Sequence, residues 1–334
     1  MSIRIAIDAM GGDDAPSVVV DGAARALRAA NGDLEILLVG RKAEVRAALA
    51  QVDGADGLAL HVVDALEVIG MGEAPAAAVK AKQGSSIHVG LGAHKSGKAH
   101  GFISAGNTGA VMAASLFILG RLEGVARPSV IGFFPTTESY SIVLDVGTNV
   151  DCRPEHLVQF AKMGSIYAKT VMKREDPVVA LLNVGEEPGK GNDLVKSAFD
   201  LLSAEAHLNF RGNVEGRDLL HHAADVVVCD GFVGNILLKF GESVASAFPH
   251  MIAEEMARQK LSDENQKAVA AVLSAVRKRF NYEEYGGAPL LGVNGNVIIG
   301  HGGSTARAFE RMILTAAEEA REGVVGAIAD AIGT

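Results

Sequence analysis

The feature that most constrains this 334-residue sequence is a predicted helix without charges. Residues 110–119 contain no charged side chain, so this helix must be buried on most of its faces. It follows a short apolar run and the small-residue turn SAGNTG. A helix that starts there leaves free N–H groups beside the side chains of Ser104, Asn107 and Thr108, an arrangement that favours a bound anion. A plain strand-to-helix turn with a capping Asn or Thr is the alternative.

The chain repeats one pattern: an apolar strand, a glycine-containing polar turn and then a helix. Residues 3–64 read as strand, helix, strand, helix and strand, which predicts a parallel sheet with right-handed crossovers. Two apolar runs at residues 129–135 and 141–146 are expected to pair as a hairpin. The sequence therefore predicts the α/β class with a mostly parallel sheet.

Six of the predicted strands end in turns rich in Gly, Asn, Asp or Ser. In an open parallel sheet the carboxyl ends of the strands share one edge, where ligands bind. We therefore expect these turns to converge on a site for phosphate or carboxylate. The turns are DAMGGD at 8–13, SAGNTG at 104–109, DVGTN at 145–149, NVGEEPGKGN at 183–192, DGFVGN at 230–235 and GHGGS at 300–304.

Composition argues against several other classes of protein. The formal net charge is −9 and no basic tract is interleaved with aromatic residues, so no nucleic-acid partner is expected. Cys152 and Cys229 lack the spacing of a disulfide framework or a zinc site. There is no signal-peptide pattern, and no apolar stretch approaches the length that crosses a membrane. These features predict a cytoplasmic protein.

The glycine turns do not match the common nucleotide-binding motifs. The nearest candidate for GxGxxG, residues 90–95, has a lysine in place of the third glycine. The segment 185–191 is one residue short of a Walker loop and ends in glycine instead of Ser or Thr. Dinucleotide binding and nucleotide hydrolysis are therefore disfavoured.

As a set, these turns resemble those of the acyl-carrier-protein-dependent phosphate acyltransferases. The segments DVGTNVDC at 145–152, NVGEEPGKG at 183–191 and YGGAPLLGVNG at 285–295 carry the resemblance together with the remaining turns. It covers essentially the whole chain, so a single domain over residues 1–334 is expected. It implies a Rossmann-like α/β/α sandwich, related to phosphotransacetylases and to isocitrate and isopropylmalate dehydrogenases, and a homodimer.

The resemblance also implies an activity. Acyl-carrier protein bearing an acyl group would react with inorganic phosphate to give acyl phosphate and free carrier. That product would feed the membrane glycerol-3-phosphate acyltransferase at the start of bacterial phospholipid synthesis. A phosphotransacetylase-type enzyme that uses acyl-CoA, and a non-catalytic anion-binding regulatory protein, are the alternatives.

Acyl transfer to phosphate needs a held anion, a polarised carbonyl and a route for the thiolate to leave. Helix N-termini and one or two cations suffice, so neither a metal nor another cofactor is expected. We assign catalysis to Lys190, which the resemblance places in the site, and to Asn235, which can donate to phosphate or to the oxyanion. A solvent-facing loop lysine and a helix cap are the simpler alternatives. The expected phosphate- and substrate-binding residues are Asp8, Gly11, Gly12, Ser104, Gly106, Asn107, Thr108, Asn149, Gly189, Gly234 and His301.

Carboxylates and thiols also lie beside the turns, and each could have a structural or a catalytic role. Asp8, Asp145 and Asp230 lie where carboxylates usually hold loop N–H groups. Cys152 and Cys229 raise the alternative of an acyl-enzyme. Because neither has a base motif beside it, we predict direct attack by phosphate.

Residues 241–281 are predicted to form a protruding pair of helices that meet near residues 259–262. The run of three cations at 277–279 suits an acidic carrier protein. The alternative is a hairpin that packs at a dimer interface; the resemblance favours carrier docking or transient peripheral membrane contact. The tip residues that suit an anionic membrane are Met256, Arg258, Lys260 and Leu261.

Overall fold

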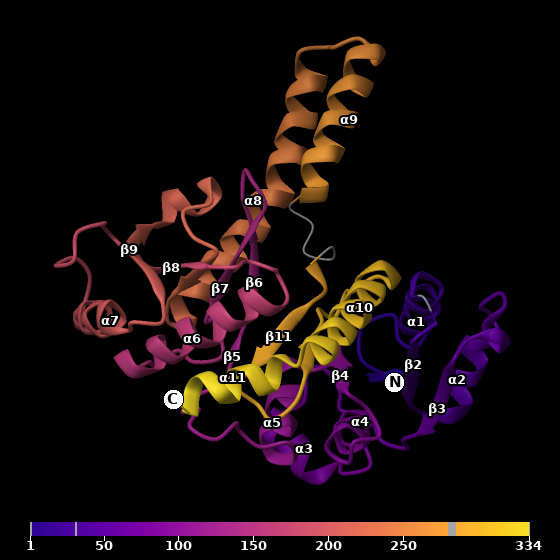
Figure 1. Ribbon diagram of the computed structural model, residues 1–334. Helices are drawn as coiled ribbons and strands as arrows, with labels where there is room; N and C mark the ends of the chain where they lie inside the picture. The colour runs from indigo at the N-terminus through magenta and orange to yellow at the C-terminus, as the bar shows by residue number, and fades with distance from the viewer. Residues whose placement is uncertain (1, 31, 280–284, 334) are drawn as a thin grey trace. The chain divides into compact units, whose positions relative to one another are not determined.

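Two structural units make up the chain, which is shown as a computed structural model in Figure 1. The structure describes residues 2–30, 32–279 and 285–333. Unit 1 comprises Met1–Ile131, Lys162–Asp176 and Glu283–Thr334, and unit 2 comprises Gly132–Ala161 and Pro177–Tyr282. Each unit has its own sheet.

The sheet of unit 1 is mostly parallel, because its apolar strands are joined through helices. Its strands are β1 (Ile3–Asp8), β2 (Leu34–Gly40), β3 (Leu60–Asp64), β4 (Gly101–Ser104), β5 (Ser129–Val130), β11 (Ala288–Leu291) and β12 (Val297–Ile299). They lie in the order β3-β2-β1-β4-β12-β11-β5. Strand β11 runs antiparallel to both of its neighbours.

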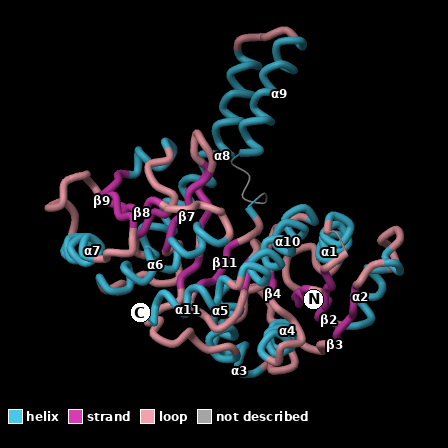
Figure 2. The backbone as a smooth tube through the Cα atoms, in the orientation of Figure 1, coloured by secondary structure: helices cyan, strands magenta, loops and turns pink. Residues whose placement is uncertain are grey.

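Helices cover both faces of this sheet, which gives an α/β/α sandwich (Figure 2). One face carries α1 (Ser17–Ala29), α2 (Lys42–Leu49) and α10 (Ala306–Glu322). The other face carries α3 (Pro75–Ala81), α4 (Ser86–Lys95) and α5 (Thr108–Ile118). The remaining helical segments of the unit are η1 (Ala55–Gly57), α11 (Val324–Gly333) and the second half of α6 (Pro154–Thr170).

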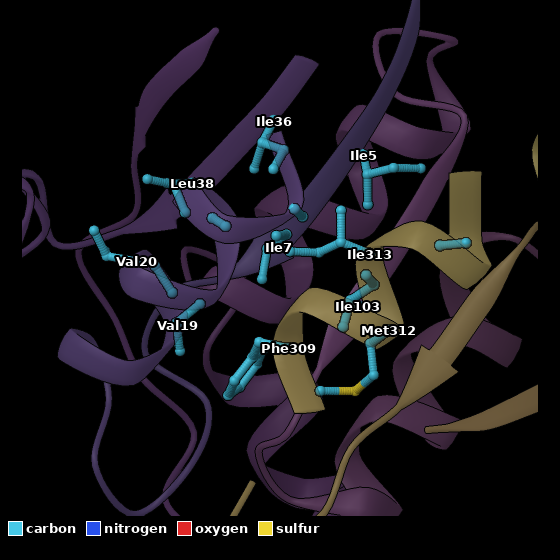
Figure 3. Close-up of a cluster of buried hydrophobic side chains, with 14 of the residues drawn as sticks. Ile5, Ile7, Val19, Val20, Ile36, Leu38, Ile103, Phe309, Met312 and Ile313 are labelled. Carbon is cyan, nitrogen blue, oxygen red and sulfur yellow. The ribbon is translucent and has the colours of Figure 1, made fainter. Parts of the chain in front are cut away.

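The core between α1, α10 and the sheet is apolar throughout (Figure 3). Gly22 of α1 makes the close helix contact possible, since a Cβ there would lie 2.4 Å from the Cβ of Phe309. Phe309 is completely buried, and burial of a phenylalanine contributes on the order of 3 kcal/mol. The labelled side chains of this core are Ile5, Ile7, Val19, Val20, Ile36, Leu38, Ile103, Phe309, Met312 and Ile313.

Helix α10 also carries a buried carboxyl group. Glu319 accepts a hydrogen bond from the hydroxyl of Tyr167 at 3.1 Å. Burial, only partly offset by that hydrogen bond, raises the pKa of Glu319 to about 8. The carboxyl is therefore neutral in the folded protein at neutral pH.

This group makes stability fall with rising pH. The folded state holds the proton of Glu319 up to about pH 8, while the unfolded chain releases it near the ordinary value of 4.5. The contribution to stability is complete below about pH 4.5 and is lost as the pH rises towards 8. Relative to Glu319→Gln, the wild type should lose about 3 kcal/mol of unfolding free energy between pH 5 and pH 8. Urea titrations at both pH values measure this, and parallel profiles for the two proteins would contradict it.

The sheet of unit 2 is parallel except at one edge. Its strands are β6 (Gly132–Pro135), β7 (Tyr140–Leu144), β8 (Val178–Asn183), β9 (Asn209–Glu215) and β10 (Val226–Val228), in the order β6-β7-β10-β8-β9. Strands β6 and β7 pair antiparallel, as expected for the predicted hairpin. The helices are the first half of α6, then α7 (Asp193–Ala204), η2 (Gly216–His221), α8 (Gly231–Arg258) and α9 (Asp263–Arg279).

Helices α8 and α9 form the predicted hairpin of unit 2. They lie side by side and extend away from β6 and β7 (Figures 1 and 2). They meet between Arg258 and Asp263, as predicted. Residues 280 and 281, the last of the predicted segment, lie outside the described residues, as do the side chains of residues 277–279. No helix in the described part of the chain is long and apolar enough to cross a membrane.

Three expectations need correction. The six turns do not share one edge, because the strands form two sheets and three turns follow the strands of each. The apolar run 129–135 is likewise divided, since β5 pairs with β11 of unit 1 and β6 pairs with β7 of unit 2. Helix α5 is also less buried than its composition predicts, because Phe117 is 75% exposed.

Candidate active site

The three turns of unit 2 follow the neighbouring strands β7, β10 and β8. Asp145, which is completely buried after β7, fixes the shape of the first of these turns. Its Oδ2 accepts hydrogen bonds from the backbone N–H and, at 3.1 Å, the side chain of Asn149. The carbonyl of Asn149 accepts from the N–H of Gly231 at 2.8 Å. Asp145 and Asn149 thus fix the start of α8.

The first turn of α8 packs closely against the turn at residues 145–149. A Cβ at Gly234 would lie only 1.9 Å from the carbonyl oxygen of Asp145, so this position requires glycine. Gly147 has φ +124°, and a Cβ there would lie 3.4 Å from Cγ of Asn235. Asn235 therefore lies directly over Gly147 and is exposed. The helix cap is Asp230, whose Oδ1 accepts from the N–H of Val233 at 2.9 Å, so the alternative role of Asn235 as the cap is wrong.

The third turn carries Lys190 on a fixed backbone. The side-chain amide of Asn183 donates to the carbonyl of Lys190 at 3.2 Å. Asn213, on the adjacent strand β9, donates to the carbonyl of Glu187 at 3.0 Å. Gly191 has φ +89°, and a Cβ there would lie 2.5 Å from Oδ1 of Asn183. The two carboxamides thus fix both ends of the segment 187–190.

The ammonium group of Lys190 stays accessible on this fixed loop. Its side chain is 54% exposed, and its Nζ lies 4.0 Å from the carboxylate of Glu187. An ion pair this long and exposed contributes little to stability. The charge of Lys190 therefore remains available to a ligand. Gly189 has open space where a Cβ would point. This lysine and the positive end of α8 make the carboxyl edge of unit 2 favourable for an anion.

Asn183 and Asn213 were not among the residues predicted from the sequence. Asn183 is the first residue of the segment NVGEEPGKG at the end of a strand, and this position could have identified it as a residue of the site. Nothing in the sequence around Asn213 indicates its role, because its partner Glu187 is 26 residues away.

The buried thiol of unit 2 is poorly suited to nucleophilic attack. Cys229 is buried, and its Sγ lies 3.6 Å from the carbonyl of Asp145. Burial, with the nearby carboxylates of Asp230 and Asp145, raises the pKa of the Cys229 thiol well above its usual range. Cys152 Sγ lies 3.3 Å from the carbonyl of Asn149. The Cys229 thiol is thus far from an activated thiolate.

Removal of either thiol should therefore leave the chemistry in place. We expect Cys152→Ala and Cys229→Ala each to retain substantial turnover, with some loss of stability for Cys229→Ala because it empties buried space. Steady-state assays of the folded variants test this. Mass-spectrometric detection of an acylated cysteine, in protein incubated with the acyl donor without phosphate, would overturn it.

The turns of unit 1 are joined by a second buried carboxylate. Asp8, at the end of β1, accepts from the hydroxyl of Ser104 at 2.7 Å, and Oγ of Ser104 accepts from the N–H of Gly106 at 3.1 Å. A Cβ at Gly11 would lie 2.7 Å from Oδ2 of Asp8. Burial raises the pKa of Asp8, although its hydrogen bonds oppose this. Asp8 thus joins the turns after β1 and β4.

Asn107 is occupied in holding another loop. Its Oδ1 caps α5 by accepting from the N–H of Ala110 at 3.0 Å. Its amide donates to the carbonyls of Gly70, Met71 and Glu73 at 3.2, 3.1 and 2.9 Å. Asn107 therefore positions the segment 70–73, and its predicted contact with phosphate would require these bonds to break.

The other predicted residues of unit 1 lie at the same edge. Thr108 is exposed at the start of α5. Gly12 has φ +115° and lies against Gly302 after β12, with the carbonyl of Gly302 accepting from the N–H of Asp13 at 2.8 Å. His301 is exposed, and its Nδ1 accepts from the N–H of Gly303 at 3.3 Å.

The described residues contain no cluster of three or more His, Cys, Asp or Glu side chains that could hold a metal ion. The structure brings Asn149, Gly234 and Asn235 together in unit 2, with Gly189 and Lys190 on the neighbouring turn. It brings Asp8, Gly11, Ser104 and Gly106 together in unit 1.

Comparison with known proteins identifies a family that matches nearly the whole chain. The sequence model described as "Fatty acid synthesis protein" matches residues 3–326. The phosphate acyltransferase of Salinibacter ruber is 56% identical over 328 residues, which covers 98% of this chain and 97% of that protein. The phosphate acyltransferase of Heliobacterium modesticaldum is 47% identical, with 99% and 98% covered.

Solved structures with the same fold are more distant in sequence. A phosphotransacetylase from Streptococcus pyogenes superposes with a TM-score of 0.64 at 20% identity, covering 96% of this chain and 94% of that one. The EutD phosphotransacetylase from Staphylococcus aureus gives a TM-score of 0.61 at 17% identity with the same coverage. A 4-hydroxythreonine-4-phosphate dehydrogenase from Burkholderia phymatum gives 0.52 at 13% identity, covering 96% of this chain and 98% of that one. At these identities the likeness shows the fold, which is the Rossmann-like fold predicted.

Proposed function

Because the chain belongs to the fatty acid synthesis protein family and is an enzyme of the phosphate acyltransferase type, we propose that it transfers an acyl group from acyl-carrier protein to inorganic phosphate. The acyl phosphate would supply the first acylation of bacterial phospholipid synthesis. The observation that carries the proposal is the accessible Lys190 ammonium on its fixed loop. Lys190 lies at the edge of the unit 2 sheet where α8 also begins.

The proposed reaction is a direct displacement at the thioester. A phosphate oxygen attacks the acyl carbonyl carbon, the carbonyl oxygen becomes an oxyanion, and the C–S bond then breaks to release the carrier thiolate. Lys190 holds the phosphate by its charge, and the amide of Asn235 donates to the oxyanion. Both groups stabilise charge at the point where it changes during the reaction.

The remaining predicted residues support this arrangement. We assign to Asn149 and Gly234 the positioning of Asn235, because they fix the start of α8. Gly189 leaves space beside Lys190 for a ligand. We also propose that the turns of unit 1 bind substrate. Their predicted binding residues are Asp8, Gly11, Gly12, Ser104, Gly106, Asn107, Thr108 and His301.

A competition between donors tests the choice of substrate. Acyl-carrier protein and coenzyme A carrying the same acyl group should be offered at equal concentration, and release of each thiol measured in the presence of phosphate. The proposal predicts a much larger kcat/KM for the carrier thioester. A larger value for acyl-CoA would instead support the phosphotransacetylase alternative. The regulatory alternative is not supported, because the relatives are named as enzymes.

We also propose that the hairpin α8–α9 of unit 2 meets macromolecular partners. Along α8 the side chains of Phe240, Phe248 and Met251 are more than half exposed. At the tip, Arg258 pairs with Glu255 at 2.8 Å and lowers the pKa of that carboxyl, so it offers less charge to an anionic membrane than its sequence suggests. We therefore favour carrier docking over membrane contact, and assign the α8 face to a second copy in a homodimer.

A charge reversal near the end of α9 tests carrier docking. Arg277→Glu with Lys278→Glu should raise the KM for acyl-carrier protein, more at low salt than at high salt, because the carrier is acidic. The KM for phosphate should not change. Leu261→Glu at the tip is the matched test for membrane contact, read as loss of liposome co-sedimentation. Wild-type behaviour of both variants would make the hairpin a structural or dimer element.

A further inference from the structure

The carboxyl edge of the unit 2 sheet presents apolar as well as polar side chains. A large apolar side chain that is more than half exposed lies in or directly after each of its three turns, namely Val150, Val184 and Phe232. Ile236, one helical turn after Phe232 on α8, is also more than half exposed. We call these four side chains the edge patch. The chemistry proposed above gives none of them a role, because neither phosphate nor an oxyanion binds an apolar group.

Hydrogen bonds hold the backbone of the edge patch in place. The N–H of Val184 donates to the side chain of the residue before it at 2.8 Å. The residues before Val150 and Phe232 are joined to each other, since the carbonyl of Asn149 accepts from the N–H of Gly231 at 2.8 Å. The patch is thus built on fixed backbone. Exposed apolar side chains that gather in this way mark a surface that binds an apolar group.

Helical spacing places the proposed oxyanion donor within the edge patch. Gly234 and Leu237 lie on the inward face of α8, against the turn after β7 and the core of unit 2. Asn235 and Ile236 follow Phe232 by three and four residues, so these three side chains share the opposite, exposed face. An acyl group whose carbonyl oxygen accepts from Asn235 therefore meets an apolar wall beside its carbonyl carbon.

The groups around the edge patch limit what can occupy it. A second copy of the chain seated there would cover Asn235 and the turn that carries Lys190, both of which the proposed reaction needs. A thin apolar chain leaves them accessible. We propose that the edge patch binds the methylenes of the acyl chain nearest to the thioester, and that Phe232 and Ile236 select long-chain over short-chain donors. This inference rests on the proposed acyl transfer and adds a chain-length preference to it.

Two donors, acetyl- and octanoyl-acyl-carrier protein, test the preference through the ratio of their kcat/KM values. The wild type should favour the octanoyl donor by about 10²-fold or more, because each buried methylene contributes about fourfold. Phe232→Ala and Ile236→Ala should each reduce this ratio by about tenfold, through a loss confined to the octanoyl donor. Phe232→Leu retains an apolar contact and should keep most of the preference.

Phe248→Ala is the matched control. Phe248 lies on the same helix and is 58% exposed, the same fraction as Phe232. It follows Phe232 by sixteen residues, which corresponds to about 24 Å along a helix. Its substitution should leave the ratio unchanged, even if loss of the proposed dimer contact lowers both kcat/KM values equally.

Binding of acyl phosphates separates failure of this inference from failure of the proposed reaction, because binding needs no turnover. In isothermal titration octanoyl phosphate should bind more tightly than acetyl phosphate, and Phe232→Ala should reduce that difference. If neither donor releases thiol in a phosphate-dependent manner, the proposed reaction is wrong, and the titration alone decides the role of the edge patch.

Three results would overturn the inference itself. The first is equal kcat/KM or equal affinity for the two chain lengths in the wild type. The second is an unchanged chain-length preference in both alanine variants. The third is a Phe232→Ala protein that loses a dimer in analytical ultracentrifugation and keeps the wild-type preference, which would make the edge patch an interface between copies of the chain.

Discussion

Lys190→Ala should lower turnover by about 10²-fold or more, the usual effect of removing one transition-state donor. The loop should keep its shape, because Asn183 and Asn213 hold it through backbone carbonyls that the substitution leaves in place. Thermal unfolding should be nearly unchanged, since the only ion pair that the lysine makes among the described residues is the loose one with Glu187.

The matched control is Lys196→Ala, an exposed lysine on α7 of the same unit. It should behave like the wild type in both kinetics and unfolding. Near-normal turnover of folded Lys190→Ala, or an equal loss in the control, would remove Lys190 from the mechanism.

Asn235→Ala is expected to have a similar effect, again about 10²-fold on turnover. Its side chain lies over Gly147 and does not cap α8, because Asp230 provides the cap. The substitution should therefore cost little stability while it removes a donor to the oxyanion. The loss should appear mainly in kcat, because the oxyanion exists only in the transition state.

Asn265→Ala in α9 removes an exposed carboxamide from the same unit and serves as the control. Its kcat should be unchanged. If Asn235→Ala unfolds at a much lower temperature than the wild type, the residue has a structural role and our assignment is wrong.

Local structure was largely predictable because it depends on neighbouring residues. The turn SAGNTG does begin a helix, with Asn107 as its cap, and the strands of residues 3–64 pair in parallel as the pattern predicts. The hairpin at the end of the chain's second unit was also predictable from helical spacing.

Long-range partners were not predictable in this way. Nothing local indicates that the run 129–135 divides between two sheets, because β7 follows it directly whereas β11 lies near the end of the chain. The amide of Asn107 binds carbonyls more than 30 residues away. Asn213 likewise acts through a contact that only the folded chain creates.

The most direct test of the proposed reaction is phosphorus NMR of purified protein with acyl-carrier protein bearing an acyl group, with and without inorganic phosphate. Direct attack predicts an acyl phosphate signal that grows in step with free carrier thiol, and no thiol release when phosphate is omitted. Stoichiometric release of thiol without phosphate, or thiol release without acyl phosphate, would contradict the account.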